Sequence, residues 1–526
     1  MCRNIEILDS TLRDGSQAQD ITFSVEDKIR IVKILDDLAI SYIEAGNPFS
    51  NPKDEVFFEV LKDIKLKNSK IVAFGSTRRK NTRPEDDNNL KALLKTSVEY
   101  VSLFGKTWDL HVEKILNTSF EENLLMIEES CRFLTDNGVT VFFDAEHFFD
   151  GYKSNKAFSI DCLKAAVRGG AKLLVLCDTN GGTLPFEMTD IIRDIQDIFP
   201  DIKIGIHAHN DSAVACAVSV MAAQMGIDHI QGTLIGFGER CGNANLSAII
   251  PNLQLKLGYL CIPEDKLRFL TRSCRQIAEI SNMSIPKSTP YIGISAFSHK
   301  AGMHIDAVSK VSSSFEHIKP SVVGNTRHFL LSEFSGKTAL IDKIKKINLT
   351  IGDNKNKLEH ILQDIKEQEK DGYHFEGADA SFQLLIRKHL GEYRSFFELI
   401  NYKIIVDNAY KQPMIMSAVV KVRVGSKERM TAAEGNGPLN ALDLALKKSL
   451  ADFYPDLIKM HLVDYKVRVI DSVLGTASRV RVITTFKDQK STWNTIGVSS
   501  NVIEASLIAL VDSIQYKLIK DHEETR

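Results

Sequence analysis

The sequence has no long apolar run and no excess of charge of one sign. None of its apolar runs approaches the roughly 20 residues that a membrane-spanning helix needs. The start of the chain, MCRNIEIL, has none of the hydrophobic region of a signal peptide. With 66 basic and 68 acidic residues, the formal net charge is −2, which disfavours a nucleic-acid-binding protein. We therefore expect a cytoplasmic protein with no membrane segment and no nucleic-acid partner.

Cysteine pairs and a phosphate-binding glycine motif are also missing. The eight cysteines are scattered without a CxxC pair, and none follows Cys274. This distribution is typical of reduced thiols and argues against a disulfide framework or a zinc knuckle. No glycine-rich fingerprint follows the first apolar run, which weakens the prediction of a doubly wound, dinucleotide-binding sheet.

The first half of the chain alternates short apolar runs with segments of helical periodicity. The length of 526 residues indicates two to four domains. Nearly continuous apolar runs, typical of strands buried on both faces, cover residues 5–10, 42–46, 71–76, 100–105, 139–147, 173–179, 202–211 and 229–236. Between the first two runs, Ser24 is a candidate helix N-cap ahead of Ile29, Val32 and Leu35 at three-residue steps. Eight such units predict a (β/α)₈ TIM barrel over residues 1–260.

A barrel of this kind carries its active site at the carboxyl ends of its strands. Polar residues stand at seven of the eight predicted strand ends: Arg13 and Asp14, Glu44, Lys106, Asp144 with Glu146 and His147, Asp178 with Thr179 and Asn180, the run from His207 to Asp211, and the loop GFGERCGNAN at 236–245. These residues are therefore expected to converge on one rim.

The motif HAHND predicts a metal site on that rim. His207 and His209 are two residues apart on a strand, so both side chains point to the same face. Asp14 would lie in the same mouth, and two histidines with one carboxylate form a common catalytic site for a divalent metal. Asn243 could add a fourth oxygen ligand. A lone HxH pair is about as often two satisfied histidines, and Asn243 also fits a simple turn.

Arg13 fits two interpretations, a structural ion pair with Asp14 or a catalytic role. Beside a metal, a guanidinium can stabilise an oxyanion that develops on a carbonyl. Thr179 and the loop NGGTLP offer donors for a carboxylate. Together these residues suggest a site for a keto acid, which a metal would polarise as a Lewis acid.

Several motifs resemble those of one enzyme family. DSTLRDGSQ, HAHND and GERCGNANL are similar to signatures of the 2-isopropylmalate, homocitrate and citramalate synthases, metal-dependent Claisen-condensing barrels related to 3-hydroxy-3-methylglutaryl-CoA lyase. GNPFSNPKD, AFGSTRR, FGKTWDLHV, DAEHFFDGYK and CDTNGGTLP resemble the citramalate branch, and TAAEGNGPLNALDLAL resembles the regulatory domain of these synthases. The resemblance covers nearly the whole chain.

This resemblance implies the condensation of acetyl-CoA, pyruvate and water to citramalate and CoA. It implies that Asp14, His207 and His209 hold a divalent metal (Zn²⁺, Mn²⁺, Mg²⁺ or Co²⁺), with Asn243 either as a further ligand or as a partner of the ligands. The implied roles of the remaining residues are oxyanion stabilisation by Arg13, carboxylate binding by Thr179, orientation of Arg13 or of the metal ligands by Glu44, a place near the acetyl group for Glu146, and proton removal by His304 from a partner subunit. For His304, a solvated polar helix face is the alternative interpretation.

Pyruvate requires a smaller pocket than the branched keto acid of 2-isopropylmalate synthase. Phe104 at the end of the fourth predicted strand, or Phe142 or Phe143 on the fifth, could provide the bulk. We expect two of these three phenylalanines to belong to the barrel core instead, and we choose Phe104 as the pocket residue.

The second half of the chain predicts helical linker subdomains over 261–400 and an α+β regulatory domain over 401–526. A shift of 64 residues aligns Leu439 with Ile503, Ala441 with Ala505 and Leu446 with Leu510, which indicates an internal repeat. Gly437, Pro438 and Asn440 mark a helix start with free backbone donors, which favours a bound carboxylate. The resemblance implies isoleucine as the effector and a homodimer; a pure dimerisation domain is the alternative.

Three rival functions stay open at this stage. A 2-isopropylmalate or homocitrate synthase would differ only in its keto acid. A lyase would cleave the carbon–carbon bond, although an effector domain favours a biosynthetic step. A catalytically dead metabolite sensor would have no need for Arg13, the predicted metal ligands and His304 together.

Overall fold

The computed structural model describes residues 3–329, 340–341, 344, 347, 355–407, 415–470 and 478–524. The chain forms two compact units. The first comprises residues 1–297 and 316–327, and the second comprises residues 298–315 and 328–526. Each unit is described separately below.

The first unit is the predicted barrel. Its eight parallel strands pair in chain order and close through β1 and β8. They are β1 Glu6–Asp9, β2 Tyr42–Gly46, β3 Lys70–Ser76, β4 Tyr100–Lys106, β5 Thr140–Glu146, β6 Leu173–Asp178, β7 Lys203–Ala208 and β8 His229–Gly232. Each lies within, or within one residue of, an apolar run of the sequence, so the predicted fold class is confirmed.

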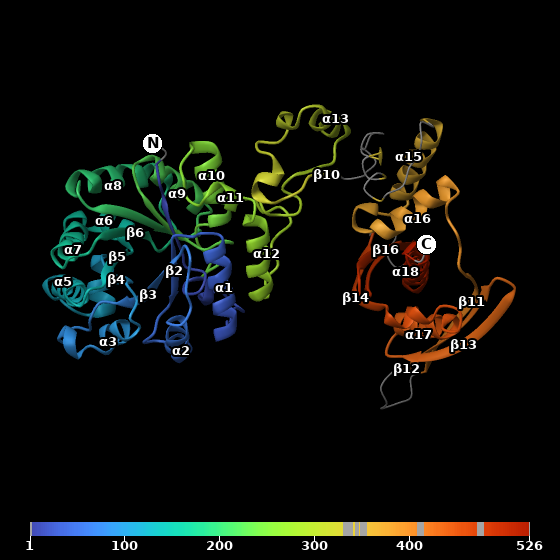
Figure 1. Ribbon diagram of the computed structural model, residues 1–526, viewed down its shortest axis with the longest axis horizontal. Coiled ribbons are helices and arrows are strands. Elements are labelled where there is room, and N and C mark those ends of the chain that lie inside the picture. The colour runs from blue at the N-terminus through green and yellow to red at the C-terminus, as the bar shows by residue number, and fades with distance from the viewer. Residues whose placement is uncertain are drawn as a thin grey trace. The chain divides into compact units, whose positions relative to one another are not determined.

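Helices surround the strands, as Figure 1 shows. They are α1 Val25–Asp37, α2 Pro52–Leu61, α3 Asn88–Lys95, α4 Asp109–His111, α5 Phe120–Asp136, α6 Phe148–Ser154, α7 Lys156–Arg168, α8 Pro185–Ile198, α9 Ala215–Gln224, α10 Leu246–Leu257, α11 Glu264–Leu267 and α12 Leu270–Ile280. Helix α1 begins at the predicted N-cap. The Ser24 side chain accepts a hydrogen bond from the Asp27 backbone N–H, and the Asp27 side chain accepts one from the Ser24 backbone N–H.

An aromatic cluster fills the lower part of the barrel interior. Tyr42 packs against Tyr100 and Phe142 with ring centroids 5.3 and 5.2 Å apart, and the His229 ring lies 5.4 Å from that of Phe142. Phe143, the next residue, points outward into the layer between the strands and the helices. The interior is therefore a packed core below the carboxyl ends of the strands, which includes the buried His229, and most candidate site residues lie above it.

The second unit carries the predicted repeat. Two three-stranded antiparallel sheets are each followed by a long helix. The first repeat has β11 Glu398–Asp407, β12 Ile415–Val424, β13 Lys427–Gly435 and α17 Pro438–Leu450; the second has β14 His461–Val469, β15 Val480–Lys487, β16 Thr492–Ser499 and α18 Val502–Glu524. Ahead of them come α13 Gly302–Lys310, α15 Lys355–Lys370 and α16 Asp379–Leu390, with short strands β9 Ser298–His299 and β10 His328–Phe329.

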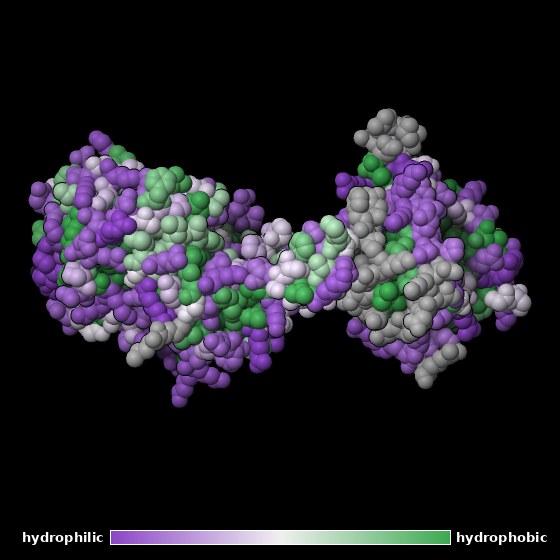
Figure 2. Space-filling model, turned by 90° about the horizontal axis from the view of Figure 1, so that it is seen from above, coloured by the Kyte–Doolittle hydropathy of each residue, from purple (hydrophilic) through white to green (hydrophobic). Residues whose placement is uncertain are grey.

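The surfaces of both units mix polar and apolar residues on the face that Figure 2 presents. Among the described residues, no helix combines the length and the hydropathy that crossing a membrane would require.

Gly497 on β16 allows the last helix to approach its sheet closely. A Cβ atom at this position would lie 1.9 Å from the carbonyl oxygen of Ala505 on α18. We predict that Gly497→Ala lowers the free energy of unfolding of the second unit by about 2 kcal/mol, because backbone rather than a flexible side chain must move. The measurement is urea denaturation of the full chain in a Trp108→Phe background, where Trp493 on the same strand is the only tryptophan.

The matched control is Gly377→Ala in the same unit. A Cβ there meets only Ile483 at 3.7 Å, an ordinary contact. A Gly497→Ala transition that coincides with that of Gly377→Ala would contradict the close-approach argument.

Candidate active site and metal centre

A cavity of about 180 Å³ opens at the carboxyl ends of the barrel strands. Its walls come from seven of the eight strand ends or the loops that follow them, β2 being the exception. The lining residues are Arg13, Asp14, Gln17, Phe74, Phe104, Asp144, Glu146, Cys177, Thr179, His207, His209 and Glu239. Seven of these are candidates from the sequence: Arg13, Asp14, Phe104, Glu146, Thr179, His207 and His209.

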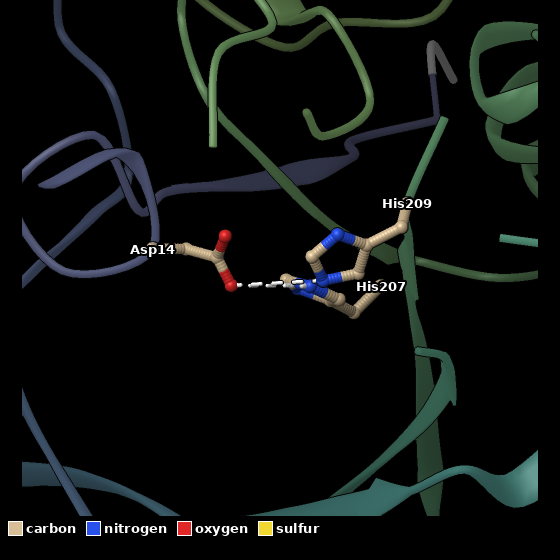
Figure 3. A group of neighbouring side chains, drawn as sticks. All are labelled: Asp14, His207 and His209. Carbon is tan, nitrogen blue, oxygen red and sulfur yellow. Dashed lines mark ion pairs between the residues drawn. The ribbon is translucent and has the colours of Figure 1, made fainter. Parts of the chain in front are cut away.

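Asp14, His207 and His209 converge in this cavity (Figure 3). The Asp14 Oδ2 atom lies 3.8 Å from Nε2 of His207 and 3.7 Å from Nε2 of His209, too far for direct hydrogen bonds. Ligands about 2.1 Å from one ion lie about 3–4 Å from one another. All three side chains are buried. The spacing and the donor types therefore fit a divalent metal ion.

The protonation states of the three residues also suit metal binding. Burial opposes ionisation of Asp14, but the charges of Arg13, His207 and His209 outweigh it and hold the pKa of the carboxyl well below its usual range. Burial lowers the pKa of His207, and burial together with the charge of His207 lowers the pKa of His209 to about 4. At neutral pH the site thus offers a carboxylate and two neutral imidazoles, the forms that bind metals.

Asn243 lies beside the three candidate ligands. Its Nδ2 atom donates to Oδ1 of Asp14 over 2.6 Å, so the carboxylate is held from the loop after β8. Its Oδ1 atom is buried without a hydrogen-bond partner among the described residues. Buried polar atoms rarely stay unpaired, and this oxygen is therefore available as a further ligand. Its role as a ligand stays a prediction.

Arg13 lies between two buried carboxylates. Its Nη1 atom donates to Asp14 Oδ2 at 2.8 Å and its Nε atom to Glu44 Oε2 at 2.6 Å. The guanidinium carbon lies 3.9 Å from the centre of the Phe74 ring. Burial alone would lower the pKa of Arg13, but Glu44 and Asp14 raise it. The guanidinium is thus charged and fixed in orientation at the cavity wall.

The loop between β1 and Asp14 is held by short side-chain contacts. Oδ1 of Asp9 accepts from the Thr11 backbone N–H, and Oγ of Ser10 accepts from that of Asp14. The Ser10 hydroxyl in turn donates to Glu44, the same carboxylate that binds Arg13. Burial raises the pKa of Asp9 to about 7. These contacts hold the turn that carries Arg13 and Asp14, whose side chains also bond to each other.

Thr179 and Glu146 line the cavity at the ends of β6 and β5. The Thr179 hydroxyl accepts from the His147 backbone N–H at 2.9 Å, and its proton is left for another acceptor. Glu146 forms an ion pair with Lys106 from the end of β4. Both residues can thus contact a molecule in the cavity.

Two residues were not predicted: Phe74, which lines the cavity, and Gln231, which lies in the barrel interior beside His207. Phe74 on β3 stacks on Phe104 with ring centroids 5.0 Å apart, and it also packs on Arg13. Gln231 on β8 contacts His207 from inside the barrel. Neither residue has a sequence signal of its own, except that Gln231 is polar within an otherwise buried strand. Phe142 and Phe143 belong to the barrel core, and Phe104 is the phenylalanine of the three that lines the cavity.

The remaining predicted residues lie in the second unit. His304 is half-buried on α13 and stacks on Phe315 with ring centroids 4.1 Å apart. Gly437, Pro438 and Asn440 lie together along a cavity of about 380 Å³, which the start of α17 and strands β14 and β15 enclose.

Three family descriptions match consecutive parts of the chain: HMGL-like at residues 4–270, homocitrate synthase post-HMGL domain-like at 291–372, and LeuA allosteric (dimerisation) domain at 376–518. The (R)-citramalate synthase of Aquifex aeolicus is 49% identical over 525 residues, which cover 100% of this chain and 99% of that protein. The chain belongs to the (R)-citramalate synthase family.

Other relatives agree with this membership. The (R)-citramalate synthase of Geobacter sulfurreducens is 48% identical over 99% of this chain and 98% of its own length. A probable 2-isopropylmalate synthase of Methanopyrus kandleri is 27% identical, with 97% of each chain covered. As an (R)-citramalate synthase, the protein is an acyltransferase that combines the catalytic barrel with a LeuA allosteric domain. The buried Asp14, His207 and His209 are consistent with the divalent metal site of HMGL-like enzymes.

We predict that Asp14→Ala abolishes metal binding and leaves the fold intact. The substitution removes one of three converging ligands, so Co²⁺ affinity should fall by more than the roughly 10–100-fold that follows loss of an outer-shell partner. Arg13 keeps Glu44 as its partner, and the melting temperature of the metal-free protein should change little. Visible absorption during Co²⁺ titration measures the affinity, and circular dichroism measures the fold.

Asp86→Ala is the matched control, because Asp86 is an exposed carboxylate in the loop after β3. Wild-type Co²⁺ affinity in Asp14→Ala would contradict the metal role.

Proposed function

We propose that this (R)-citramalate synthase condenses acetyl-CoA with pyruvate and water to citramalate and CoA through the cavity described above. The observation that carries the proposal is the buried Asp14–His207–His209 group beside the Arg13 guanidinium, in a cavity of about 180 Å³. The Asp14 carboxylate, the two imidazoles and the Arg13 guanidinium in such proximity suit a small 2-oxo acid. The carboxylate and keto oxygens of such a substrate bind to positive charges or hydrogen-bond donors.

Asp14, His207 and His209 would hold a divalent metal, with the carboxamide oxygen of Asn243 as a further ligand. Such an ion would act as a Lewis acid on the keto group of the substrate. An oxygen and imidazole ligand set suits Zn²⁺, Mn²⁺, Mg²⁺ or Co²⁺.

Arg13 and Thr179 would bind and orient the keto acid. The Nη2 group of Arg13 has no hydrogen bond to the described residues, since Nε and Nη1 serve Glu44 and Asp14. It is therefore available to the keto oxygen, where negative charge develops as the new carbon–carbon bond forms. The free proton of the Thr179 hydroxyl would bind the substrate carboxylate.

Removal of a proton from the acetyl methyl group requires a base. We assign this role to His304, which would come from the partner subunit of a homodimer, because histidine is the side chain that most often serves as a general base in enzymes. Glu146 would stand beside the acetyl group. The resulting carbon nucleophile attacks C2 of pyruvate, the alkoxide takes up a proton, and water then cleaves the thioester to release CoA.

The stacked pair Phe74 and Phe104 would select pyruvate. Both rings line the cavity, and Phe74 cannot move away without losing its contact with Arg13. A keto acid with an isopropyl group would have to displace one of them. Thiol release from acetyl-CoA with pyruvate, 2-oxoisovalerate and 2-oxoglutarate in turn tests the proposal: activity only with pyruvate supports it, and activity only with another keto acid would replace it with that synthase activity.

We predict that Phe104→Ala raises the ratio of kcat/KM for 2-oxoisovalerate to that for pyruvate by about tenfold or more, because each methyl group admitted is worth about 1–3 kcal/mol. Phe142→Leu is the control. It alters a phenylalanine that is packed in the barrel core, so it should lower stability and leave the ratio unchanged. An unchanged ratio in Phe104→Ala would refute the pocket assignment.

We further propose that residues 401–526 bind isoleucine in the cavity at the start of α17. The helix begins at Pro438 after Gly437, with no side-chain cap and no acidic residue in its first turn, so its backbone donors favour a carboxylate. Asp443 faces the same cavity; burial raises its pKa although Lys447 opposes this, and its Oδ1 atom has no partner among the described residues. That oxygen suits the ammonium group of an amino acid, and Leu462 and Phe486 suit its side chain.

At the start of α18, the equivalent helix of the second repeat, side chains of the protein itself already occupy this position. On α18, Asn501 caps the backbone N–H of Ile503, and Glu504 in the first turn accepts from the hydroxyl of Ser499. A carboxylate of the chain itself thus neutralises this helix start. The difference supports one effector site in each chain, at α17.

We predict that Asp443→Asn weakens inhibition by isoleucine at least ~10-fold, because a charge-assisted hydrogen bond to the ammonium group is lost. The uninhibited kcat should not change, since Asp443 lies on α17 and none of the residues assigned to catalysis lies within 401–526. Thiol release at increasing isoleucine concentrations measures this, with Asp452→Asn, at an exposed position just after α17, as the control. Equal inhibition of both variants by isoleucine would contradict the proposed effector site. If isoleucine does not inhibit the wild-type protein, dimerisation is the only role left for this domain.

A further inference from the structure

Gln231 lies inside the barrel on β8, beside one of the candidate metal ligands. Its side chain is fully buried. Oε1 of Gln231 lies 3.0 Å from Nδ1 of His207, and Nε2 of Gln231 donates to Oδ1 of Asp144 over 3.2 Å. The three residues come from β7, its neighbour β8, and β5, which is separated from β7 by β6. They form a chain of hydrogen bonds across the barrel interior, from the candidate metal centre to Asp144 in the cavity wall.

The chemistry of this chain fixes the tautomer of His207. The amide nitrogen of Gln231 points to Asp144, whose carboxyl oxygen accepts from it. Burial and the charge of Glu44 raise the pKa of Asp144 to about 7, and a carboxyl group keeps an oxygen acceptor in either protonation state. The amide oxygen must then face His207, and an oxygen there requires the proton of the imidazole on Nδ1. The lone pair of His207 is left on Nε2, the atom that faces Asp14.

His209 has no comparable support. Its Nδ1 atom is buried and has no hydrogen-bond partner among the described residues. The two imidazoles therefore differ: one has its tautomer and ring orientation set by the barrel interior, and the other does not. In known metal sites, outer partners of histidine ligands typically change metal affinity by about 10–100-fold.

We propose that Gln231 and Asp144 are positioning residues that hold His207 in its metal-binding tautomer. The inference rests on the metal site of the proposed function. Asp144 also lines the substrate cavity. Asp144 would act without contacting the metal, because it orients the side-chain amide of Gln231.

Co²⁺ titration of the metal-free full-length protein, followed by visible absorption, tests this inference. Gln231→Leu removes the acceptor and keeps most of the volume, and we expect its Co²⁺ affinity to fall about 10–100-fold. Gln231→Glu keeps an oxygen acceptor toward Nδ1, and its second oxygen can share one proton with Asp144, whose pKa burial already raises. Its Co²⁺ affinity should therefore stay within about threefold of the wild type. Asp144→Asn allows the Gln231 amide to flip and should lower the affinity about threefold to tenfold.

Asn123→Leu is the matched control for loss of a buried carboxamide. Asn123 is fully buried on α5 and donates to the backbone of Lys106, away from the three ligands. Thermal melts of the metal-free variants separate a loss of folding from a loss of affinity. Gln231→Leu with wild-type affinity, or a loss no larger than that of Asn123→Leu, would overturn the inference.

Asp14→Ala, measured in the same titration, tests the metal site separately from the positioning role of Gln231. If Asp14→Ala binds Co²⁺ like the wild type, the metal site itself is wrong. If Asp14→Ala loses binding and Gln231→Leu does not, the metal site stands and only the positioning role falls.

Discussion

The charged row Glu44–Arg13–Asp14 is the interaction on which the mouth of the barrel depends. All three charges are nearly out of contact with water, and a charge buried alone would be strongly unfavourable. Arg13 neutralises two carboxylates at once, so Asp14 stays ionised although it is buried. These two contacts use the Nε and Nη1 donors of Arg13, and the Nη2 group is left for a molecule in the cavity. In the proposed function, metal binding and oxyanion stabilisation would both rest on this one guanidinium in one orientation.

Much of this arrangement is predictable from the chain alone, for a physical reason. Parallel strands bring their carboxyl ends to one rim, so polar residues after each apolar run must meet there, and the two-residue spacing of His207 and His209 puts both imidazoles on one face. Gln231 and Phe74 were not found, because their contacts depend on how neighbouring strands are aligned across the barrel. Phe142 and Phe143 show the same limit: both faces of the strand are apolar, and periodicity cannot tell the interior from the helix layer.

The two repeats of the regulatory domain differ at the starts of their long helices. They share strand order and helix position, and the similarity is visible in the sequence. Glu504 lies in the first turn of α18, whereas no acidic residue lies in the first turn of α17. Asp443 could not be predicted as a cavity residue, because strands of the other repeat line the same cavity. The proposed effector site thus rests on divergence at a few polar positions.

The bond from Asn243 to Asp14 joins the two ends of the barrel sequence. Its partners are 229 residues apart, and they lie in the loops that follow β1 and β8, the pair of strands that closes the barrel. The catalytic mouth therefore cannot exist in a nascent chain until the eighth strand and its loop have left the ribosome. Until then, Arg13 and Asp14 remain solvated on an open sheet edge, where an early metal ion would find only a fraction of its ligands. During synthesis, the chain therefore becomes able to bind the metal ion only when the barrel is complete.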